Sequence, residues 1–152
     1  MGKKLIAYMV TWTTYGTWLQ GDKRGYVKDG QILPRDDKLK SANEKQQKFE
    51  TFKLNSSHKQ LVKDAILAGA EIVNQKIIDL AVCSNHIHLL VEEAGGSIEK
   101  TVRRYKIAAT LALRQNGIQG KIWSDGYDKR FCYTNEEIEQ KIKYIQKHND
   151  AG

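Results

Sequence analysis

Two histidines, His86 and His88, stand one residue apart at the start of the apolar stretch SNHIHLLVEE. Alternate residues of a β-strand project from the same face, so the two imidazoles point together while Ile87 points to the opposite face. Two imidazoles side by side suit a divalent metal ion, because imidazole is a common metal ligand in proteins. The same residues also fit a plainer interpretation, in which they only form hydrogen bonds at the start of a strand.

A second candidate pair lies near the C-terminus, where Tyr144 and His148 are four residues apart. Residues at this spacing are neighbours on the surface of an α-helix. Both fall on one flank of an apolar stripe at helical spacing, which comprises Ile138, Ile142 and Ile145. A tyrosine on such a flank can reach a site without being buried, and His148 offers a third imidazole beside the phenol for the metal that His86 and His88 suit. The alternative is a tyrosine that only packs at the edge of the helix.

The chain has two cysteines, Cys83 and Cys132. Two cysteines are too few for a disulfide scaffold and are typical of a reducing cytoplasm. A structural zinc site that draws on Cys83, Cys132 or His148 is a third alternative, although the sequence has no CxxC or HxxxH pair of the kind that such sites use.

Apolar patterning predicts the elements that must position these residues. Stretches rich in β-branched and aromatic residues indicate strands over residues 5–14, 76–84, 86–93 and 128–134. Helical spacing and capping residues predict a helix that begins at Ser56 or Ser57, a second between Ser97 and Gly117, and a third that begins at Thr134. The order β-α-β-β-α-β plus a C-terminal helix is that of an α+β, ferredoxin-like (RRM-like) antiparallel sheet. With helices on one face of this sheet, the other face is free for the two histidines.

The composition fits one folded domain over residues 1–152. Hydrophobic residues make up 40% of the chain and charged residues 28%, which are globular values rather than those of a disordered tail. Residues 28–56 differ from the rest, because they are polar, rich in lysine and contain the only proline, Pro34. We therefore expect them to form an insertion or flexible excursion after the first strand.

The net charge of +7, with a pI near 9.3, suits a polyanionic partner such as nucleic acid, although basic proteins without one are common. The opening MGKKLIAYMVTWTTYG has an apolar run that is too short for a signal peptide or a membrane span. We therefore expect a soluble, cytoplasmic protein with no membrane partner.

Four stretches together resemble the single-tyrosine HUH transposases, and in particular the REP-associated tyrosine transposases of bacteria, which are related to small insertion-sequence transposases. They are the strand with His86-Ile87-His88, TWTTYGTWLQGDKRGYV, IWSDGYDKRFCYTNEE and the C-terminal YIQKHN. The resemblance covers roughly residues 5–149. A His-hydrophobic-His motif alone is a weak signal, but with a tyrosine and a ligand four residues later on a downstream helix it is specific.

This resemblance implies metal-dependent cleavage of single-stranded or hairpin DNA and strand transfer through a 5′-phosphotyrosine intermediate, the chemistry of DNA transposition. His86, His88 and His148 would be ligands of Mg²⁺ or Mn²⁺, and Tyr144 the nucleophile. Relatives more often have Gln or Asn at the position of His148, so the choice of metal stays open. A homodimer also stays open, since insertion-sequence relatives work as dimers in which the tyrosine helix completes the partner's site, whereas REP-associated members can act as monomers.

Basic residues supply candidate contacts for DNA phosphates. They are Lys100, Arg103, Arg104, Lys106, Lys121 and Arg130. The alternative for these residues is a solvated helix or loop surface. Aromatic residues near the first strand could stack on unpaired bases: Trp12, Tyr15, Trp18 and Tyr26. The alternative is that Trp12 and Trp18 cover the edge of the sheet or, for Trp12, pack in the core. An alternative function is a catalytically inactive nucleic-acid-binding module on the same fold, although the K/R-G-F/Y-G/A-F signature of RNA-recognition domains is absent.

Overall fold

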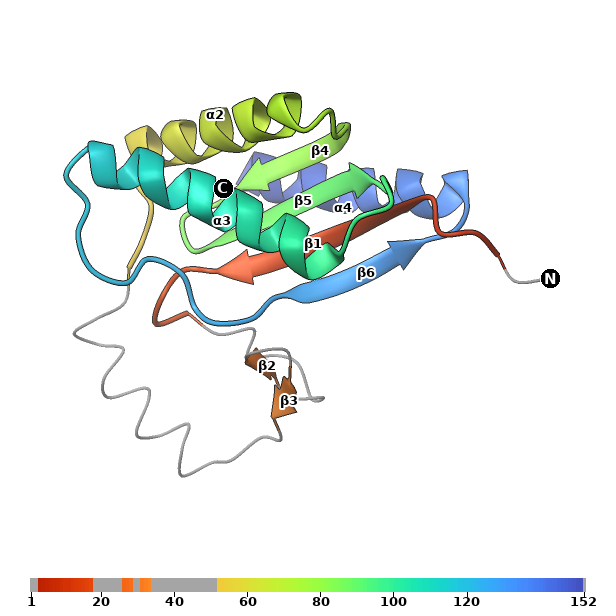
Figure 1. Ribbon diagram of the computed structural model, residues 1–152, viewed down its shortest axis with the longest axis horizontal. Helices are drawn as coiled ribbons and strands as arrows, with labels where there is room; N and C mark the ends of the chain where they lie inside the picture. Colours follow the sequence, from red (N-terminus) through yellow and green to blue (C-terminus); the bar gives the residue numbers. More distant parts are fainter. Residues whose placement is uncertain (1–2, 18–25, 29–30, 34–51, 152) are drawn as a thin grey trace.

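A four-stranded antiparallel sheet forms the centre of the computed structural model, which describes residues 3–17, 26–28, 31–33 and 52–151. Its strands are β1 (Ala7–Thr13), β4 (Ile77–Val82), β5 (His86–Glu92) and β6 (Asp128–Cys132), and they lie in the order β4-β5-β1-β6 (Figure 1). A separate antiparallel pair joins β2 (Tyr26–Lys28) to β3 (Gln31–Leu33). The predicted α+β, ferredoxin-like arrangement is confirmed.

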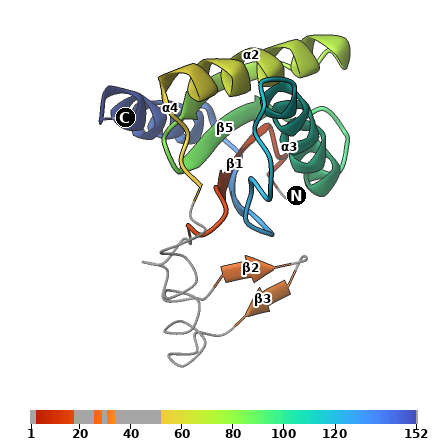
Figure 2. The same cartoon turned by 90° about the vertical axis from the view of Figure 1, so that its left-hand side faces the viewer.

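Helices cover both faces of the sheet. Helices α2 (Ser56–Ile72) and α3 (Ile98–Gln115) lie side by side on one face, and α4 (Asn135–Ala151) lies on the other (Figure 2). The core under α2 and α3 takes alternate strand residues, which are Tyr8, Val10 and Trp12 from β1 and Ile87, Leu89 and Val91 from β5. The core under α4 takes the residues between them, including Ala7, Met9 and Leu90. None of the described helices combines the length and apolar character that a membrane span requires.

The helix caps agree with the sequence in two of three cases. Ser97 caps α3 and accepts a hydrogen bond from the backbone of Lys100 at 3.3 Å. Thr134 accepts one from the backbone of Glu137 at 3.2 Å at the start of α4. The predicted cap of α2 at Ser56 or Ser57 is wrong, because the preceding residue, Asn55, forms a reciprocal box with His58. Ser56 and Ser57 already belong to the helix, and Asn55, with its extended backbone, is the capping residue.

The predicted insertion at residues 28–56, including Pro34, lies largely outside the described residues, as do Trp18 and the side chain of Tyr26. The described end of this segment, residues 52–56, differs from the predicted flexible excursion, because it packs back against the core. Leu54 is buried, and its backbone donates to the carbonyl of Ser84 at 2.7 Å. Phe52 packs against the same core. The extent of a single domain over residues 1–152 stays a prediction.

Candidate metal and tyrosine site

Strand β5 presents His86 and His88 on the face of the sheet that α4 covers. His88 lies opposite Thr11 of β1 in the strand register, and its side chain is 4% exposed. His86 lies at the start of the strand and is partly buried. Their imidazole ring centroids are 4.7 Å apart. The prediction that these two side chains share a face, opposite to Ile87, is therefore confirmed.

Helix α4 brings Tyr144 and His148 onto the same site. Its stripe of Ile138, Ile142 and Ile145 packs on the sheet, with Ile145 fully buried. Two contacts hold the end of the helix against β4 and the residue after it: the side-chain amide of Asn149 donates to the carbonyl of Leu80 at 3.2 Å, and the thiol of Cys83 donates to the carbonyl of His148 at 3.8 Å. One chain thus assembles the whole group of side chains.

The three histidines form one cluster. The His148 ring lies 4.4 Å from the His88 ring and 5.4 Å from the His86 ring, measured between centroids. One nitrogen from each of the three lies within 4.8 Å of the other two. Among the described residues, no cysteine belongs to this cluster. Within the described part of the chain, the possible metal ligands that cluster are therefore the three histidines rather than Cys83 or Cys132.

The hydrogen bonds of the cluster leave the same ring nitrogen available on each histidine. Every Nδ1 is already engaged: that of His86 by Asn85 Oδ1 (2.7 Å), that of His88 by Thr11 Oγ1 (2.8 Å) and that of His148 by the carbonyl of Tyr144 (2.9 Å). The Nε2 of His88 is buried and has no hydrogen-bond partner among the described groups. A buried nitrogen without a partner costs free energy, and a metal ion would satisfy it. Three imidazoles with Nε2 free are a donor set that a divalent transition-metal ion fits.

Burial keeps two of these imidazoles neutral. It lowers the pKa of His88 to about 3, with further contributions from His86 and then His148. The pKa of His86 is also lowered, first by burial and then by His148. A neutral imidazole carries the lone pair that binds a metal, so both side chains are in the ligand form near neutral pH.

The phenol of Tyr144 lies at the rim of the cluster. Its ring centroid is 4.5 Å from that of His148 and 5.2 Å from that of His88. The side chain is 45% exposed, so a large substrate can approach it. Tyr144 is therefore exposed beside the three histidines, whereas Tyr105 is fully buried on the other face of the sheet.

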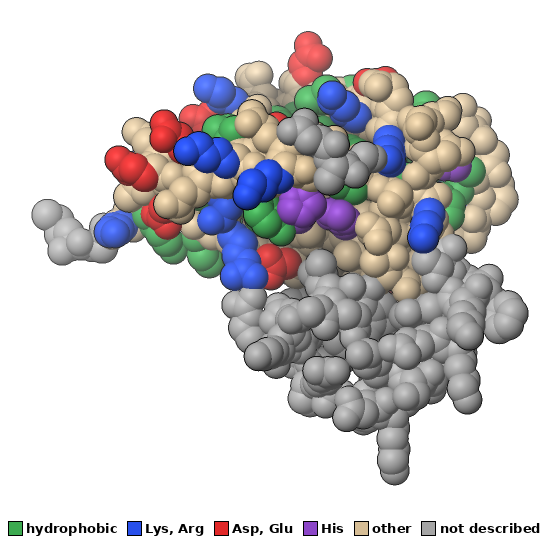
Figure 3. Space-filling model, turned by 180° about the vertical axis from the view of Figure 1, so that it is seen from behind, with side chains coloured by type: hydrophobic (Ala, Val, Ile, Leu, Met, Phe, Trp, Pro, Cys, Tyr) green, Lys and Arg blue, Asp and Glu red, His purple; other side chains and the backbone are tan. Residues whose placement is uncertain are grey.

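The predicted phosphate contacts divide between the two faces of the sheet. Lys100, Arg103 and Arg104 belong to α3, which covers the face opposite to the histidines. Arg130 lies opposite Met9 in the register of β6 with β1, and Met9 faces α4, so Arg130 shares the face of the cluster. Its guanidinium pairs with Asp128 at 3.0 Å. Figure 3 shows histidine side chains at this surface with lysine and arginine side chains beside them.

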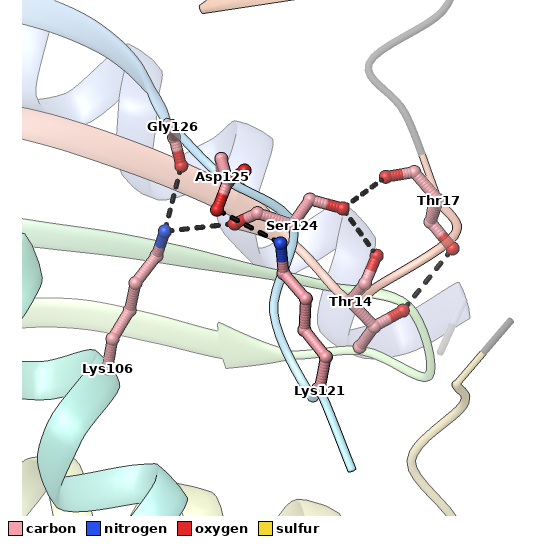
Figure 4. A network of polar contacts seen from close by, with 7 residues as sticks. All are labelled: Thr14, Thr17, Lys106, Lys121, Ser124, Asp125 and Gly126. Carbon is pink, nitrogen blue, oxygen red and sulfur yellow. Dashed lines mark hydrogen bonds and ion pairs between the residues drawn. The ribbon is translucent and has the colours of Figure 1, made fainter. Parts of the chain in front are cut away.

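The other two predicted contacts belong to a polar network at the end of the sheet (Figure 4). Lys106 is partly buried, and its ammonium donates to the carbonyls of Ser124 at 3.2 Å and Gly126 at 2.9 Å. Burial lowers its pKa to about 8. Lys121 pairs with Asp125 at 3.1 Å and also lies over the ring of Tyr15. Lys106 is therefore engaged in contacts within the fold, and its contact with DNA stays a prediction.

The same network continues to the histidine cluster. The hydroxyl of Ser124 donates to the carbonyls of Thr14 at 2.9 Å and Thr17 at 3.0 Å (Figure 4). The backbone of Thr14 in turn donates to the carbonyl of Asn85 at 3.0 Å. Asn85 is the residue whose side chain engages His86. Asn85 and Thr11 carry no local signal in the sequence, because their contacts depend on a turn and on strand register.

Known proteins give two kinds of match. A family model described as "Transposase IS200 like" matches residues 44–148. The solved structure of a REP-associated tyrosine transposase bound to a REP hairpin has a TM-score of 0.57 and 14% identity, and the match covers 95% of this chain and 67% of that one. A protein from Deinococcus radiodurans R1, provisionally described as a transposase, has a TM-score of 0.47 and 16% identity, over 97% of this chain and 95% of that one. No curated protein matches the sequence. At 14% identity, the first of these structures shows a shared fold.

Proposed function

The chain belongs to the family of IS200-like transposases, enzymes that act in DNA transposition, and we propose that it cleaves and rejoins single-stranded DNA with Tyr144 as the nucleophile. One observation carries this proposal. Three imidazoles and a half-exposed phenol, from a strand and a helix that are far apart in the sequence, meet on one face of the sheet.

Tyr144 would attack the phosphorus of a DNA phosphodiester. The bond from its phenol oxygen to phosphorus forms and the bond from phosphorus to the 3′-oxygen breaks. The phenol loses one proton and the leaving 3′-oxygen takes one up. The products are a 5′-phosphotyrosine and a free 3′-hydroxyl. Attack by a 3′-hydroxyl reverses the step and releases the phenol, so strands are rejoined without ATP. A half-exposed side chain suits this role because the substrate is a polymer that must approach from outside.

His86, His88 and His148 would hold a divalent metal ion. When bound, such an ion orients the scissile phosphate and offsets the negative charge that builds up in the transition state. The histidines contribute neutral imidazoles whose remaining nitrogens are fixed by hydrogen bonds. Three nitrogen donors suit a transition-metal ion such as Mn²⁺ better than Mg²⁺, which prefers oxygen ligands.

The substrate we propose is single-stranded or hairpin DNA. The net charge of +7 favours a polyanion, and the solved transposase with the same fold is bound to a REP hairpin. Arg130 is our candidate for a phosphate contact beside the site, because it shares the face of the histidines. Lys100, Arg103 and Arg104 would contact DNA only where it passes the opposite face. Since one chain supplies all the site residues, the proposed chemistry does not require a second chain.

The test is a search for a covalent protein–DNA adduct. Labelled hairpin oligonucleotides are incubated with the protein and Mn²⁺ and separated on denaturing gels. Tyr144→Phe, His86→Ala and EDTA should each abolish the adduct. Tyr133→Phe is the matched control, because Tyr133 is also exposed but lies outside the cluster, and it should leave the adduct intact.

The outcomes separate this proposal from its alternative. An adduct that survives Tyr144→Phe would move the nucleophile to another residue, which peptide mapping would identify. Binding of many hairpins without any adduct would instead favour a catalytically inactive DNA-binding module on the same fold.

A further inference from the structure

Thr11 is a polar side chain in a strand that is buried along its whole length. Strand β1 has the sequence AYMVTWT with every residue buried, and Thr11 itself is 4% exposed. A buried hydroxyl is costly unless it forms a hydrogen bond. That of Thr11 lies 2.8 Å from Nδ1 of His88. Valine would fill nearly the same volume, so the hydroxyl is the feature that distinguishes this position.

Asn85 engages the neighbouring histidine in the same way. Its side-chain oxygen lies 2.7 Å from Nδ1 of His86. An amide oxygen can only accept, so this contact requires the proton of His86 on Nδ1 and leaves the lone pair on Nε2. The backbone of Asn85 is itself held by Thr14 at 3.0 Å, which fixes the position of the acceptor.

His148 shows the same arrangement with a backbone partner. Its Nδ1 lies 2.9 Å from the carbonyl oxygen of Tyr144, which also can only accept. His86 and His148 therefore carry their lone pairs on Nε2, because the oxygens that face their Nδ1 atoms can only accept a hydrogen bond. Only the partner of His88 is ambiguous, because a hydroxyl can donate or accept.

The surroundings of His88 decide which role the hydroxyl takes. If Thr11 donated to Nδ1, the ring proton would sit on Nε2. That nitrogen is buried without a hydrogen-bond partner among the described residues, and the N–H would have no acceptor. If Thr11 accepts, Nε2 of His88 carries the lone pair and can bind a metal ion, in a cluster where one nitrogen of each histidine lies within 4.8 Å of the other two.

We propose that Thr11 and Asn85 are positioning residues that fix the tautomer and ring orientation of His88 and His86, so that both Nε2 atoms bind one divalent metal ion. This inference rests on the proposed metal site. In this arrangement Nδ1–H of His88 donates to the hydroxyl of Thr11, and Nδ1–H of His86 donates to the side-chain oxygen of Asn85. Loss of such a partner typically weakens metal binding by about 10- to 100-fold.

The test compares Thr11→Val, Thr11→Ser and Asn85→Ala with the wild type. The dissociation constant for Mn²⁺ is measured by electron paramagnetic resonance of the free ion, and histidine tautomers are read from ¹⁵N chemical shifts of the metal-free protein. We expect Thr11→Val and Asn85→Ala each to weaken Mn²⁺ binding by about 10- to 100-fold, whereas Thr11→Ser keeps near wild-type affinity. The Nδ1–H tautomer of His88 should be lost in Thr11→Val and retained in Thr11→Ser.

Thr101→Val is the matched control. Thr101 is also 4% exposed, but it lies on α3, on the other side of the sheet, and bonds to the carbonyl of Ser97. This variant should leave Mn²⁺ affinity and the histidine tautomers unchanged. If Thr11→Val does not fold by circular dichroism, Thr11→Ser and Asn85→Ala still carry the test.

Two negative results have different meanings. Unchanged Mn²⁺ affinity and tautomers in Thr11→Val and Asn85→Ala, with binding lost in His86→Ala, would overturn this inference and leave the proposed metal site intact. A wild-type protein that takes up neither Mn²⁺ nor Co²⁺ would overturn the metal site itself. In that case an unchanged His88 tautomer in Thr11→Val would overturn the role of Thr11 as well.

Discussion

Acid should destabilise the metal-free protein through His88, whose imidazole is buried beside two other histidines. Burial and these neighbours lower its pKa to about 3, from an ordinary value of 6.5. The unfolded chain therefore binds the proton more readily than the folded protein. The stability linked to His88 is complete above about pH 6.5 and is lost progressively as the pH falls toward 3.

The size of this loss follows from the two pKa values. At about pH 5, the unfolded imidazole is mostly protonated and the folded one is not. The pKa of the imidazole in the unfolded chain then lies about 1.5 units above the pH of the solution. This difference corresponds to about 2 kcal/mol of lost stability. The loss cannot grow below a pH of about 3, because both states are then protonated.

Urea unfolding in EDTA, followed by circular dichroism at about pH 7.5 and about pH 5, measures this effect. Wild type is compared with His88→Gln, which has no titrating imidazole at this position. Carboxylates titrate in both proteins and cancel in the comparison. We expect the free energy of unfolding to fall by about 2 kcal/mol more in the wild type than in the variant. Equal losses would refute the reasoning, because they would mean that the folded protein protonates His88 without cost.

Arg130→Ala should weaken binding of hairpin DNA and reduce its salt dependence, because a phosphate contact releases a counterion. Fluorescence anisotropy measures both, with Lys100→Ala as the control. An equal loss of affinity in the two variants would contradict this prediction. The protein should bind Mn²⁺ with a dissociation constant at least about tenfold lower than that for Mg²⁺, because the donors are nitrogens. Titration calorimetry measures both constants, and equal values would argue against a site of three imidazoles. Lys106→Met should lower the free energy of unfolding by about 1–3 kcal/mol, because the carbonyls of Ser124 and Gly126 lose their donor. Urea unfolding measures this change, and an unaltered midpoint would mean that the network adds no stability.

The order of the four strands in the main sheet and of helices α2, α3 and α4 could be predicted from hydrophobic periods, whereas the short strands β2 and β3 were not predicted. Alternation in β5 also separated the side of His86 and His88 from the side of Ile87. The helical spacing of Tyr144 and His148 placed them together on α4. The structure brings these four polar side chains into one cluster, and their roles in metal binding and catalysis stay predictions.

Contacts that depend on strand register or on a chain reversal could not be predicted. Thr11 meets His88 because β1 pairs with β5 in one particular register, and no local pattern sets that register. The helical period of α3 shows which residues are exposed but not which face of the sheet the helix covers. The sequence therefore predicts phosphate contacts for Lys100 and Arg130 alike, although the two lie on opposite faces of the sheet. Leu54 returns to the core from a polar segment, and a single apolar residue gives no periodic signal.

The polar network at the end of the sheet has an evolutionary consequence. Lys106 on one helical layer is linked through Ser124, Thr14 and Asn85 to His86 on the opposite face. The links pass through the backbone of Ser124, Thr14 and Asn85, so a shift of this backbone after the loss of one side chain would reach the others. Among homologues, we therefore expect Lys106 and Asn85 to be retained or exchanged together, even though no contact joins them directly. Selection on DNA chemistry would in this way reach a lysine on the far side of the sheet.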